Sequence, residues 1–160
     1  MIRVAVVILS ILFGSVSFFC GDAFSWSITN QVSEVLEKRI NHSESGQNII
    51  CKHRLLCSSA VLPRFYQRRK FQPAWSSSYG PTAEAKNLVI AIHEAEYEGL
   101  RPEDYHLSTI ENSINDIYQS NSITGKFDPD KLADLDLLLT DAFLLYVSHM
   151  ISGRVNPETI

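Results

Sequence analysis

Residues 128–153 read DPDKLADLDLLLTDAFLLYVSHMISG, and this stretch predicts one helix of about 24 residues, roughly 36 Å long. Asp128 is placed to cap it, Pro129 suits its first turn, and Gly153 follows its end. Apolar residues occupy nearly every face, so such a helix needs neighbours on several sides. Three acidic residues interrupt the run and argue against a membrane span: Asp134, Asp136 and Asp141. We therefore expect a long central helix.

Apolar residues at helical spacing predict four more helices upstream, over residues 26–41, 58–70, 82–98 and 108–119. Ser58 or Ser59 is expected to cap the second of them, with Pro63 early enough in the helix to be tolerated. Ser108 with Glu111 three residues later predicts a capping box at the start of the fourth.

The segments between these helices are short. Residues 42–47 and 76–80 contain turn-forming residues and read as loops, and Gly99 suits the C-terminal cap of the third helix. Residues 48–56 fit either a short strand or an extended arm. The expected fold is therefore mainly α, a small helical scaffold of about five helices around one long central helix, with a short extended segment allowed near 48–56.

The N-terminus has the pattern of a secretory signal peptide over residues 1–25. A short basic start precedes an apolar run over residues 4–19, and small residues follow. Cleavage is expected after Ser25, with Ala23 as the second choice, which leaves a mature chain of residues 26–160. An uncleaved membrane anchor is the alternative, although the run is shorter than the roughly 20 residues of a membrane span. We expect export, with membrane contact only through this segment.

The charge and the motif content narrow the function further. The formal net charge of −4 argues against a nucleic-acid partner, because surfaces that bind nucleic acid are usually basic. Neither a glycine-rich phosphate loop nor a Gly-x-Ser-x-Gly elbow is present, so no cofactor site is indicated. Cys51 and Cys57 are interpreted as buried thiols, although a disulfide stays open to them in a strand-and-turn geometry. His53 lies between them, but the second ligand pair of a zinc site is missing.

An acidic cluster in the long helix has both a chemical and a structural interpretation. Asp134, Asp136, Asp141 and His149 would suit a metal or an acid–base site, but no further ligand motif accompanies them. We favour the structural interpretation, in which Asp134 is a solvated acid of the early turns. A buried Asp141 then needs a partner, for which Arg154 is the candidate. His149 gains from the helix dipole near the C-terminal end.

Two other clusters are weighed in the same way. Four cations gather in the second predicted helix: Arg64, Arg68, Arg69 and Lys70. They would suit phosphates or an anionic wall polymer, but the negative net charge favours a solvated helix face whose aromatic neighbours point inward. The segment PEDYH at residues 102–106 would suit a catalytic loop, and we favour a short turn that Tyr105 anchors to the core.

Three segments, in this order, resemble the signatures of the large murein L,D-transpeptidases. They are LPRFYQRRKFQPAW at 62–75, AIHEAEYEGLRPEDYH at 91–106, and LDLLLTDAFL at 135–144 followed by Tyr146, His149 and GRVNP at 153–157. One such segment alone would be weak, whereas three in order are fairly specific. In that family these segments belong to an N-terminal, mostly helical scaffold domain.

The resemblance implies a scaffold domain over residues 26–160 that continues beyond Ile160. The enzymes of this family cross-link peptidoglycan in the periplasm. Their catalytic part is a β-rich domain with a His and a nucleophilic Cys in a Ser-x-Gly-Cys-x-Arg type motif, and neither Cys51 nor Cys57 has that context. The resemblance thus implies a chain that is not itself an enzyme, with the missing catalytic domain and peptidoglycan as its partners.

No catalytic, cofactor-binding or metal-binding residue is assigned from the sequence. The structural candidates are Asp141, Arg154, Tyr105 and Trp75. The resemblance implies that the first two pair and fix the end of the long helix. The alternative function is a stand-alone periplasmic helical module that binds peptidoglycan or a partner protein, and a weaker third option is a hydrolase that uses Asp104 or His106.

Overall fold

The structure, a computed structural model, describes residues 27–44, 50–51 and 54–153. Its helices are α1 (Ile28–Glu44), α2 (Leu62–Arg68), α3 (Ala83–His93), α4 (Leu107–Thr124) and α5 (Pro129–Ser152), with 3₁₀ turns η1 (Glu94–Glu98) and η2 (Pro102–Tyr105). Two antiparallel strand pairs complete it: β1 (Ile50–Cys51) with β2 (Arg54–Leu55), and β3 (Ser76–Ser77) with β4 (Gly80–Pro81). The prediction of a mainly α fold is confirmed. The predicted signal peptide lies outside the described residues.

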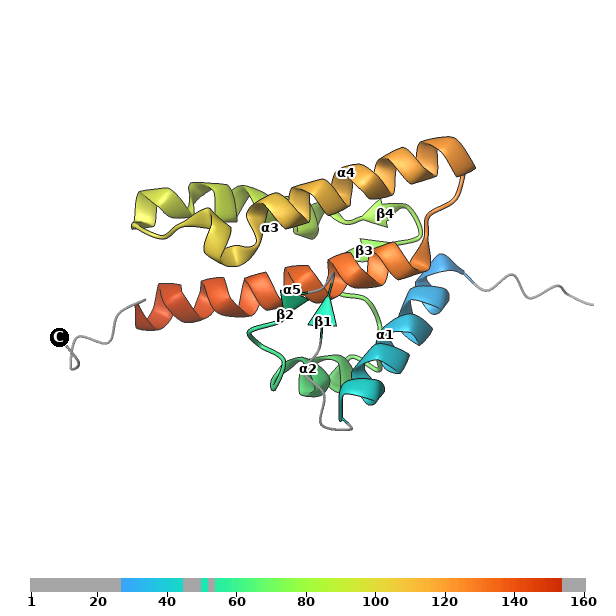
Figure 1. Cartoon of the computed structure of the whole chain (residues 1–160), viewed down its shortest axis with the longest axis horizontal. Helices are drawn as coiled ribbons and strands as arrows, with labels where there is room; N and C mark the ends of the chain where they lie inside the picture. Colours follow the sequence, from blue (N-terminus) through green and yellow to red (C-terminus); the bar gives the residue numbers. More distant parts are fainter. Residues whose placement is uncertain (1–26, 45–49, 52–53, 154–160) are drawn as a thin grey trace, which may run out of the picture.

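Helix α5 runs through the middle of the molecule. In Figure 1, α1 and α2 lie on one side of it, and α3 and α4 lie on the other. The Asp128 carboxylate caps its start by accepting hydrogen bonds from the N–H groups of Asp130 (2.9 Å) and Lys131 (3.4 Å). The predicted bounds and cap of this helix are confirmed.

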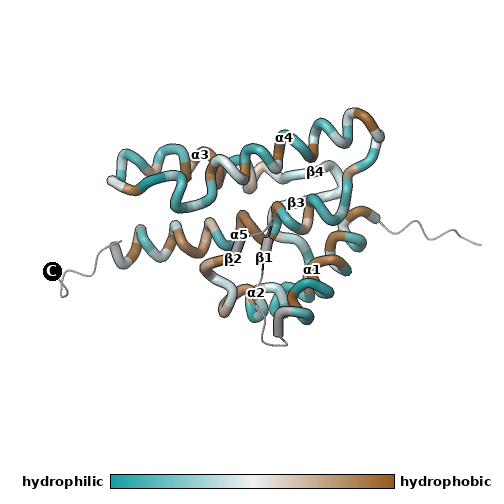
Figure 2. Tube along the Cα trace, in the orientation of Figure 1, coloured by the Kyte–Doolittle hydropathy of each residue, from teal (hydrophilic) through white to brown (hydrophobic). Residues whose placement is uncertain are grey.

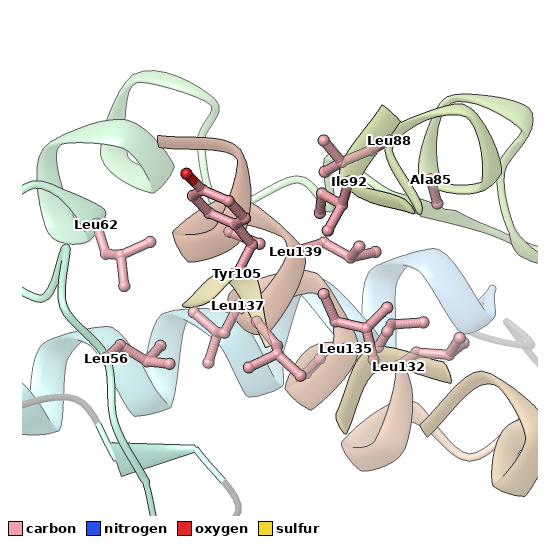
Figure 3. Close-up of a cluster of buried hydrophobic side chains, with 14 of the residues drawn as sticks. Leu56, Leu62, Ala85, Leu88, Ile92, Tyr105, Leu132, Leu135, Leu137 and Leu139 are labelled. Carbon is pink, nitrogen blue, oxygen red and sulfur yellow. The ribbon is translucent and has the colours of Figure 1, made fainter. Parts of the chain in front are cut away.

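The hydrophobic core forms around the first half of α5, in agreement with the prediction that this helix has neighbours on several sides. Every leucine of its first half has at most 1% of its surface exposed: Leu132, Leu135, Leu137, Leu138 and Leu139. Figure 3 shows Leu135, Leu137 and Leu139 between Leu56 and Leu62 on one side and Leu88 and Ile92 of α3 on the other. A helix buried on every face behaves as a core helix, whose stability comes from packing more than from propensity.

The second half of α5 is less covered. Phe143, Met150 and Ile151 are exposed, and Figure 2 shows hydrophobic segments along this helix while the outer layer of α3 and α4 is mostly polar. By length and composition alone, α5 is long and apolar enough to cross a membrane. The buried core helix of a globular protein meets the same criteria. The two aspartates buried in α5, Asp136 and Asp141, agree with a core helix.

Helix α2 starts later than predicted. Neither Ser58 nor Ser59 caps it, because the chain turns over residues 57–61 and the helix begins at Leu62 behind Val61, with Pro63 in its first turn. The backbone N–H of Ser58 is instead committed to a carboxylate of α5. A contact from a distant segment therefore replaces the expected local cap.

The capping box predicted for α4 is also wrong. The helix starts at Leu107 behind His106, and the Ser108 hydroxyl donates to the Glu103 carboxylate instead of capping. The Glu111 Oε1 lies 2.7 Å from His93 Nε2 of α3. Both residues of the expected capping box therefore interact with other residues instead of capping the helix.

Smaller differences concern bounds. Helix α1 continues to Glu44 into the predicted 42–47 loop, and α4 continues to Thr124 rather than ending near residue 119. Within the predicted 76–80 loop, Ser76 pairs with Pro81 and Ser77 with Gly80 in a minimal β ladder. The open choice at 48–56 is resolved in favour of strands, and Gly99 does cap the end of the third helical segment, where it adopts a φ of 72°.

Gly80 offers a test of the β3–β4 turn. Its φ is 90°, and a Cβ atom there would come within 2.8 Å of the Phe127 ring. We expect Gly80→Ala to lower the free energy of unfolding by about 3 kcal/mol, from left-handed strain and overpacking together. Gly125→Ala is the matched control, since its φ is 70° but nothing lies within 4 Å of the added Cβ. Urea denaturation that gave equal losses for both variants would rule out the Phe127 contact.

Candidate functional site

The carboxylate of Asp136 is buried at the centre of the molecule and accepts four hydrogen bonds. Its Oδ1 accepts from the Tyr66 hydroxyl (2.8 Å) and the Ala74 N–H (2.9 Å). Its Oδ2 accepts from the Trp75 N–H (2.8 Å) and the Ser76 hydroxyl (3.3 Å). Burial raises the pKa of this carboxyl, and the four donors offset part of that effect. One side chain of α5 thus holds the segment that leaves α2.

Thr140 lies one turn after Asp136 and extends this network. The Trp75 indole N–H donates to its Oγ1 at 2.9 Å, and the Tyr66 hydroxyl lies 2.8 Å from the same oxygen. The Trp75 ring also packs against Phe143, with 5.7 Å between ring centroids. Trp75, a structural candidate from the sequence, is thereby tied to two successive turns of α5.

Asp141 is the second buried carboxylate of α5, and it holds two other segments. Its Oδ1 accepts from the Ser58 N–H at 2.6 Å, and its Oδ2 accepts from the Cys57 N–H at 3.3 Å. The His106 Nε2 lies 2.8 Å from the same Oδ2. Burial alone would raise the pKa of this carboxyl, but the hydrogen bonds from His106 and Ser58 outweigh it and lower the pKa. An ionised Asp141 requires that His106 Nε2 carries a proton.

Cys57 lies beside this carboxylate, in an exposed position and as a free thiol. Desolvation and the negative charge of Asp141 raise the pKa of the Cys57 thiol. A nucleophilic cysteine needs the opposite shift, toward thiolate at neutral pH. The proximity of Cys57, His106 and Asp141 therefore lacks the activated thiol of a Cys–His mechanism. The predicted burial of this thiol is wrong, because the turn before α2 exposes it, and Cys51 lies where side chains are not described.

Tyr105 and His149 join η2 to the last turns of α5. The Tyr105 ring is fully buried, and its hydroxyl lies 2.9 Å from His149 Nδ1. The ring also meets Tyr146 edge-on, with 5.4 Å between centroids. The predicted turn at 102–106, anchored by its tyrosine, is confirmed.

The acidic cluster considered from the sequence is divided among separate partners. Asp134 is only partly exposed and pairs with Arg39 of α1, which also contacts Asp130 at 3.1 Å, so the expectation of a solvated Asp134 is wrong. Asp136 and Asp141 each serve different loops, as described above. Among the described residues, no group of three His, Cys, Asp or Glu side chains is arranged to hold a metal ion.

Arg154, the predicted partner of Asp141, lies outside the described residues. The donors found at Asp141 come from residues 57–58 and from His106, which sequence spacing did not indicate. The role of Asp136 was missed as well. One signal was present in the sequence, since an acid on a helix that is apolar all round must be given hydrogen-bond donors when it is buried.

The arrangement as a whole is a framework. Within the described part of the chain, every buried side-chain nitrogen or oxygen has a hydrogen-bond partner. The buried carboxylates of Asp136 and Asp141 accept hydrogen bonds from donors of the protein itself. Each binds a segment more than 30 residues away in the sequence. Carboxylates used in this way hold the backbone of distant segments in place.

Comparison with known proteins bears on this framework. The family model described as "Scaffold domain" matches residues 60–160. The chain belongs to this scaffold domain family. Searches of the curated proteins and of the solved structures found no match. The match covers α2 to α5, and so includes every acceptor and most of the donors of the two carboxylate networks.

The folded unit is larger than the matched scaffold domain. Helix α1 precedes residue 60, yet it buries Val32, Leu36 and Ile40 in the same core. It also supplies Arg39 to the start of α5. Physically, α1 is part of the scaffold domain in this protein, because without it one face of α5 would lose its cover.

Proposed function

We propose that this chain is the non-catalytic scaffold portion of a periplasmic peptidoglycan L,D-transpeptidase, exported by a signal peptide over residues 1–25. One observation supports the finer assignment beyond the scaffold domain family. The three segments at 62–75, 91–106 and 135–157 resemble signatures of that enzyme family in the same order. The non-catalytic part of the proposal corresponds to the lack of a Ser-x-Gly-Cys motif in these 160 residues.

The observation that carries the proposal is how the three segments meet. Tyr66 and Trp75 of the first segment bind Asp136 and Thr140 of the third. Tyr105 and His106 of the second bind His149 and Asp141 of the third, as described above. The signature residues are thus partners of one another in one packed framework, which is the property expected of a scaffold that supports chemistry located elsewhere.

The decisive experiment reads the DNA beyond codon 160 in the source genome. We expect an open frame that encodes a β-rich domain with a Ser-x-Gly-Cys-x-Arg motif. An in-frame stop with no such domain nearby would contradict the assignment to an L,D-transpeptidase and favour the stand-alone module.

A second experiment tests the non-catalytic part of the proposal. The chain from Trp26 onward, incubated with muropeptides that contain meso-diaminopimelate, is expected to leave them unchanged when analysed by mass spectrometry. Any new cross-link or hydrolysis product that persists in Asp104→Asn and His106→Gln variants would point to an undetected active site elsewhere, and loss of the product in those variants would support the hydrolase option.

The predicted export is tested separately. N-terminal sequencing of the protein recovered from the periplasm should begin at Trp26, or at Phe24 if cleavage follows Ala23. An intact Met1 on membrane-bound protein would show that the segment is an anchor.

A further inference from the structure

The positive and negative charges of this chain are segregated along the sequence. Residues 45–83 contain six lysines and arginines and no Asp or Glu, whereas residues 84–160 contain five lysines and arginines against fourteen acids. The net charge of −4 conceals this division. A local field depends on where charges lie, so the net charge does not decide whether one face is basic.

The fold places the basic helix α2 and many of the acids on opposite sides of α5. Helix α2, in the basic stretch, lies on one side of α5, and α3 and α4 lie on the other (Figure 1). Residues 83–124, from the start of α3 to the end of α4, carry eight of the fourteen acids. Helix α1, the neighbour of α2, exposes Glu34 and Glu37, but neither pairs with a cation of α2 within the described residues. The basic charge of α2 is therefore not neutralised by the rest of the described structure.

Three cations of this region form what we call the α2 basic surface: Arg64, Arg68 and Lys70. All three side chains are exposed, and none has a hydrogen bond or ion pair within the described part of the chain. Other arginines behave differently, since Arg39 pairs with two aspartates and Arg101 pairs with Asp104. Arg64 and Arg68 are four residues apart, so they project from one helix face about 6 Å apart along the axis.

The turn that carries Lys70 is held firmly in an unfavourable conformation. Lys70 and Phe71 have φ values of 53° and 58°, in the left-handed region that residues other than glycine seldom adopt. Arg69 maintains the turn by donating to the carbonyls of Gln72 (3.2 Å) and Pro73 (2.9 Å). Ser33 of α1 donates to the Phe71 carbonyl at 2.9 Å. Arg69 is thus a structural cation, and the other three are left for solvent or a ligand.

We propose that the α2 basic surface binds the carboxylates of peptidoglycan stem peptides and so holds the scaffold domain on the wall polymer. Guanidinium groups match carboxylates in a bidentate geometry, and a pair one helical turn apart can contact successive carboxylates of an extended polymer. A membrane fits less well, because Val61 is the one exposed large hydrophobic residue within residues 57–73. This inference rests on the proposed function, which supplies peptidoglycan as the polymer.

The test is sedimentation of the chain from Trp26 to Ile160 with purified sacculi at low and at physiological salt. Arg64→Gln with Arg68→Gln should weaken binding on the order of tenfold at low salt, since two exposed charge pairs are lost. Lys86→Gln with Lys126→Gln is the matched control, because it removes the same charge from exposed lysines outside the surface. This control should bind within about twofold of the unaltered chain.

Two further arms separate the ligand chemistries. Sacculi whose carboxyls have been amidated should no longer bind, while undiminished binding would point to phosphate polymers and overturn the proposal. Tighter binding to vesicles of anionic phospholipid than to sacculi would overturn it in favour of a membrane surface. Arg64→Lys with Arg68→Lys should retain most of the binding, and thermal melts of all variants should match, because the altered side chains have no partners to lose.

The outcomes distinguish this surface from the function it rests on. Suppose that a downstream catalytic domain exists but that the arginine-to-glutamine and the lysine-to-glutamine double variants bind sacculi equally well. The proposed binding surface is then wrong and the scaffold assignment stands. If carboxylate-dependent binding requires Arg64 and Arg68 but no such domain follows, the surface stands and the transpeptidase assignment is wrong.

Discussion

Asp136→Ala is expected to lower the free energy of unfolding by about 4 kcal/mol, the largest effect of any single polar substitution in the described structure. The change strands two backbone N–H groups and the Ser76 hydroxyl in the core, while the Tyr66 hydroxyl keeps Thr140 as a partner. Each stranded donor costs about 1–3 kcal/mol unless water replaces the carboxylate. With a typical stability of 5–15 kcal/mol for a domain, this loss should lower Tm by about 8–16 °C. Circular dichroism melts would measure it.

Two controls accompany this variant. Asp116→Ala removes an exposed carboxylate that pairs with Lys131 at 3.0 Å, and it should cost at most about 1 kcal/mol. Asp136→Asn keeps one acceptor oxygen but turns an amide N–H₂ toward the donors, so an intermediate loss is expected. If Asp136→Ala were no more harmful than Asp116→Ala, the four hydrogen bonds would not be holding residues 74–76.

Asp141→Asn is expected to cost about 2 kcal/mol at neutral pH and to change how stability depends on pH. The asparagine loses the charge-assisted hydrogen bonds from Ser58, Cys57 and His106, which are typically stronger than neutral ones. An unchanged Tm would show that this carboxylate does not fix the packing of α5 against its neighbours.

The sign of the pH effect follows from the lowered pKa of Asp141. A carboxylate whose folded pKa is depressed stabilises the fold above its unfolded pKa of 3.8, and that contribution is lost as the pH falls through the folded value. The gap in stability between the unaltered chain and Asp141→Asn should thus be constant above about pH 5 and should shrink below pH 3.8. Asp136 acts in the opposite direction, because burial raises its pKa, so only the difference between the two chains isolates Asp141.

The same variant addresses the predicted pairing with Arg154. A double-mutant cycle of Asp141→Asn and Arg154→Gln should show coupling of at least about 0.5 kcal/mol if the two side chains interact. Strict additivity would mean that residues 57–58 and His106 satisfy Asp141 by themselves.

Local signals predicted those parts of the fold whose stabilising contacts are also local. The cap, the first proline and the apolar surface of α5 all lie within one stretch of sequence, so this helix could be predicted from that stretch alone. The turn at 102–106 was predicted from its tyrosine, a residue that often anchors a turn to the core. The errors arose where a distant residue supplied the contact. The N–H of Ser58 binds a carboxylate 83 residues later, and no capping rule contains that information.

In the candidate site, too, the sequence predicted what depends on a residue's own type but not the contacts with distant residues. The sequence identified Asp141, Trp75 and Tyr105 as structural residues, because buried acids and aromatic residues need partners. It could not name those partners, since Ala74 and Trp75 contribute backbone N–H groups that any residue possesses. Residues such as Lys70 and Phe71, with positive φ and no glycine, also give no local warning, because their conformation is imposed by contacts from Arg69 and Ser33.

The central position of α5 has a consequence for the order of events during synthesis. A ribosome makes α1, the β1–β2 pair and α2 to α4 before the one helix against which they pack, so the nascent chain carries their apolar faces uncovered. The contacts of α5 with α1 and α2 join segments far apart in sequence, which makes closure of the core slow and late. A chain stopped or cleaved within residues 132–142 would leave all earlier layers without their common partner, and we expect it to be handled by chaperones and proteases as an unfolded polypeptide.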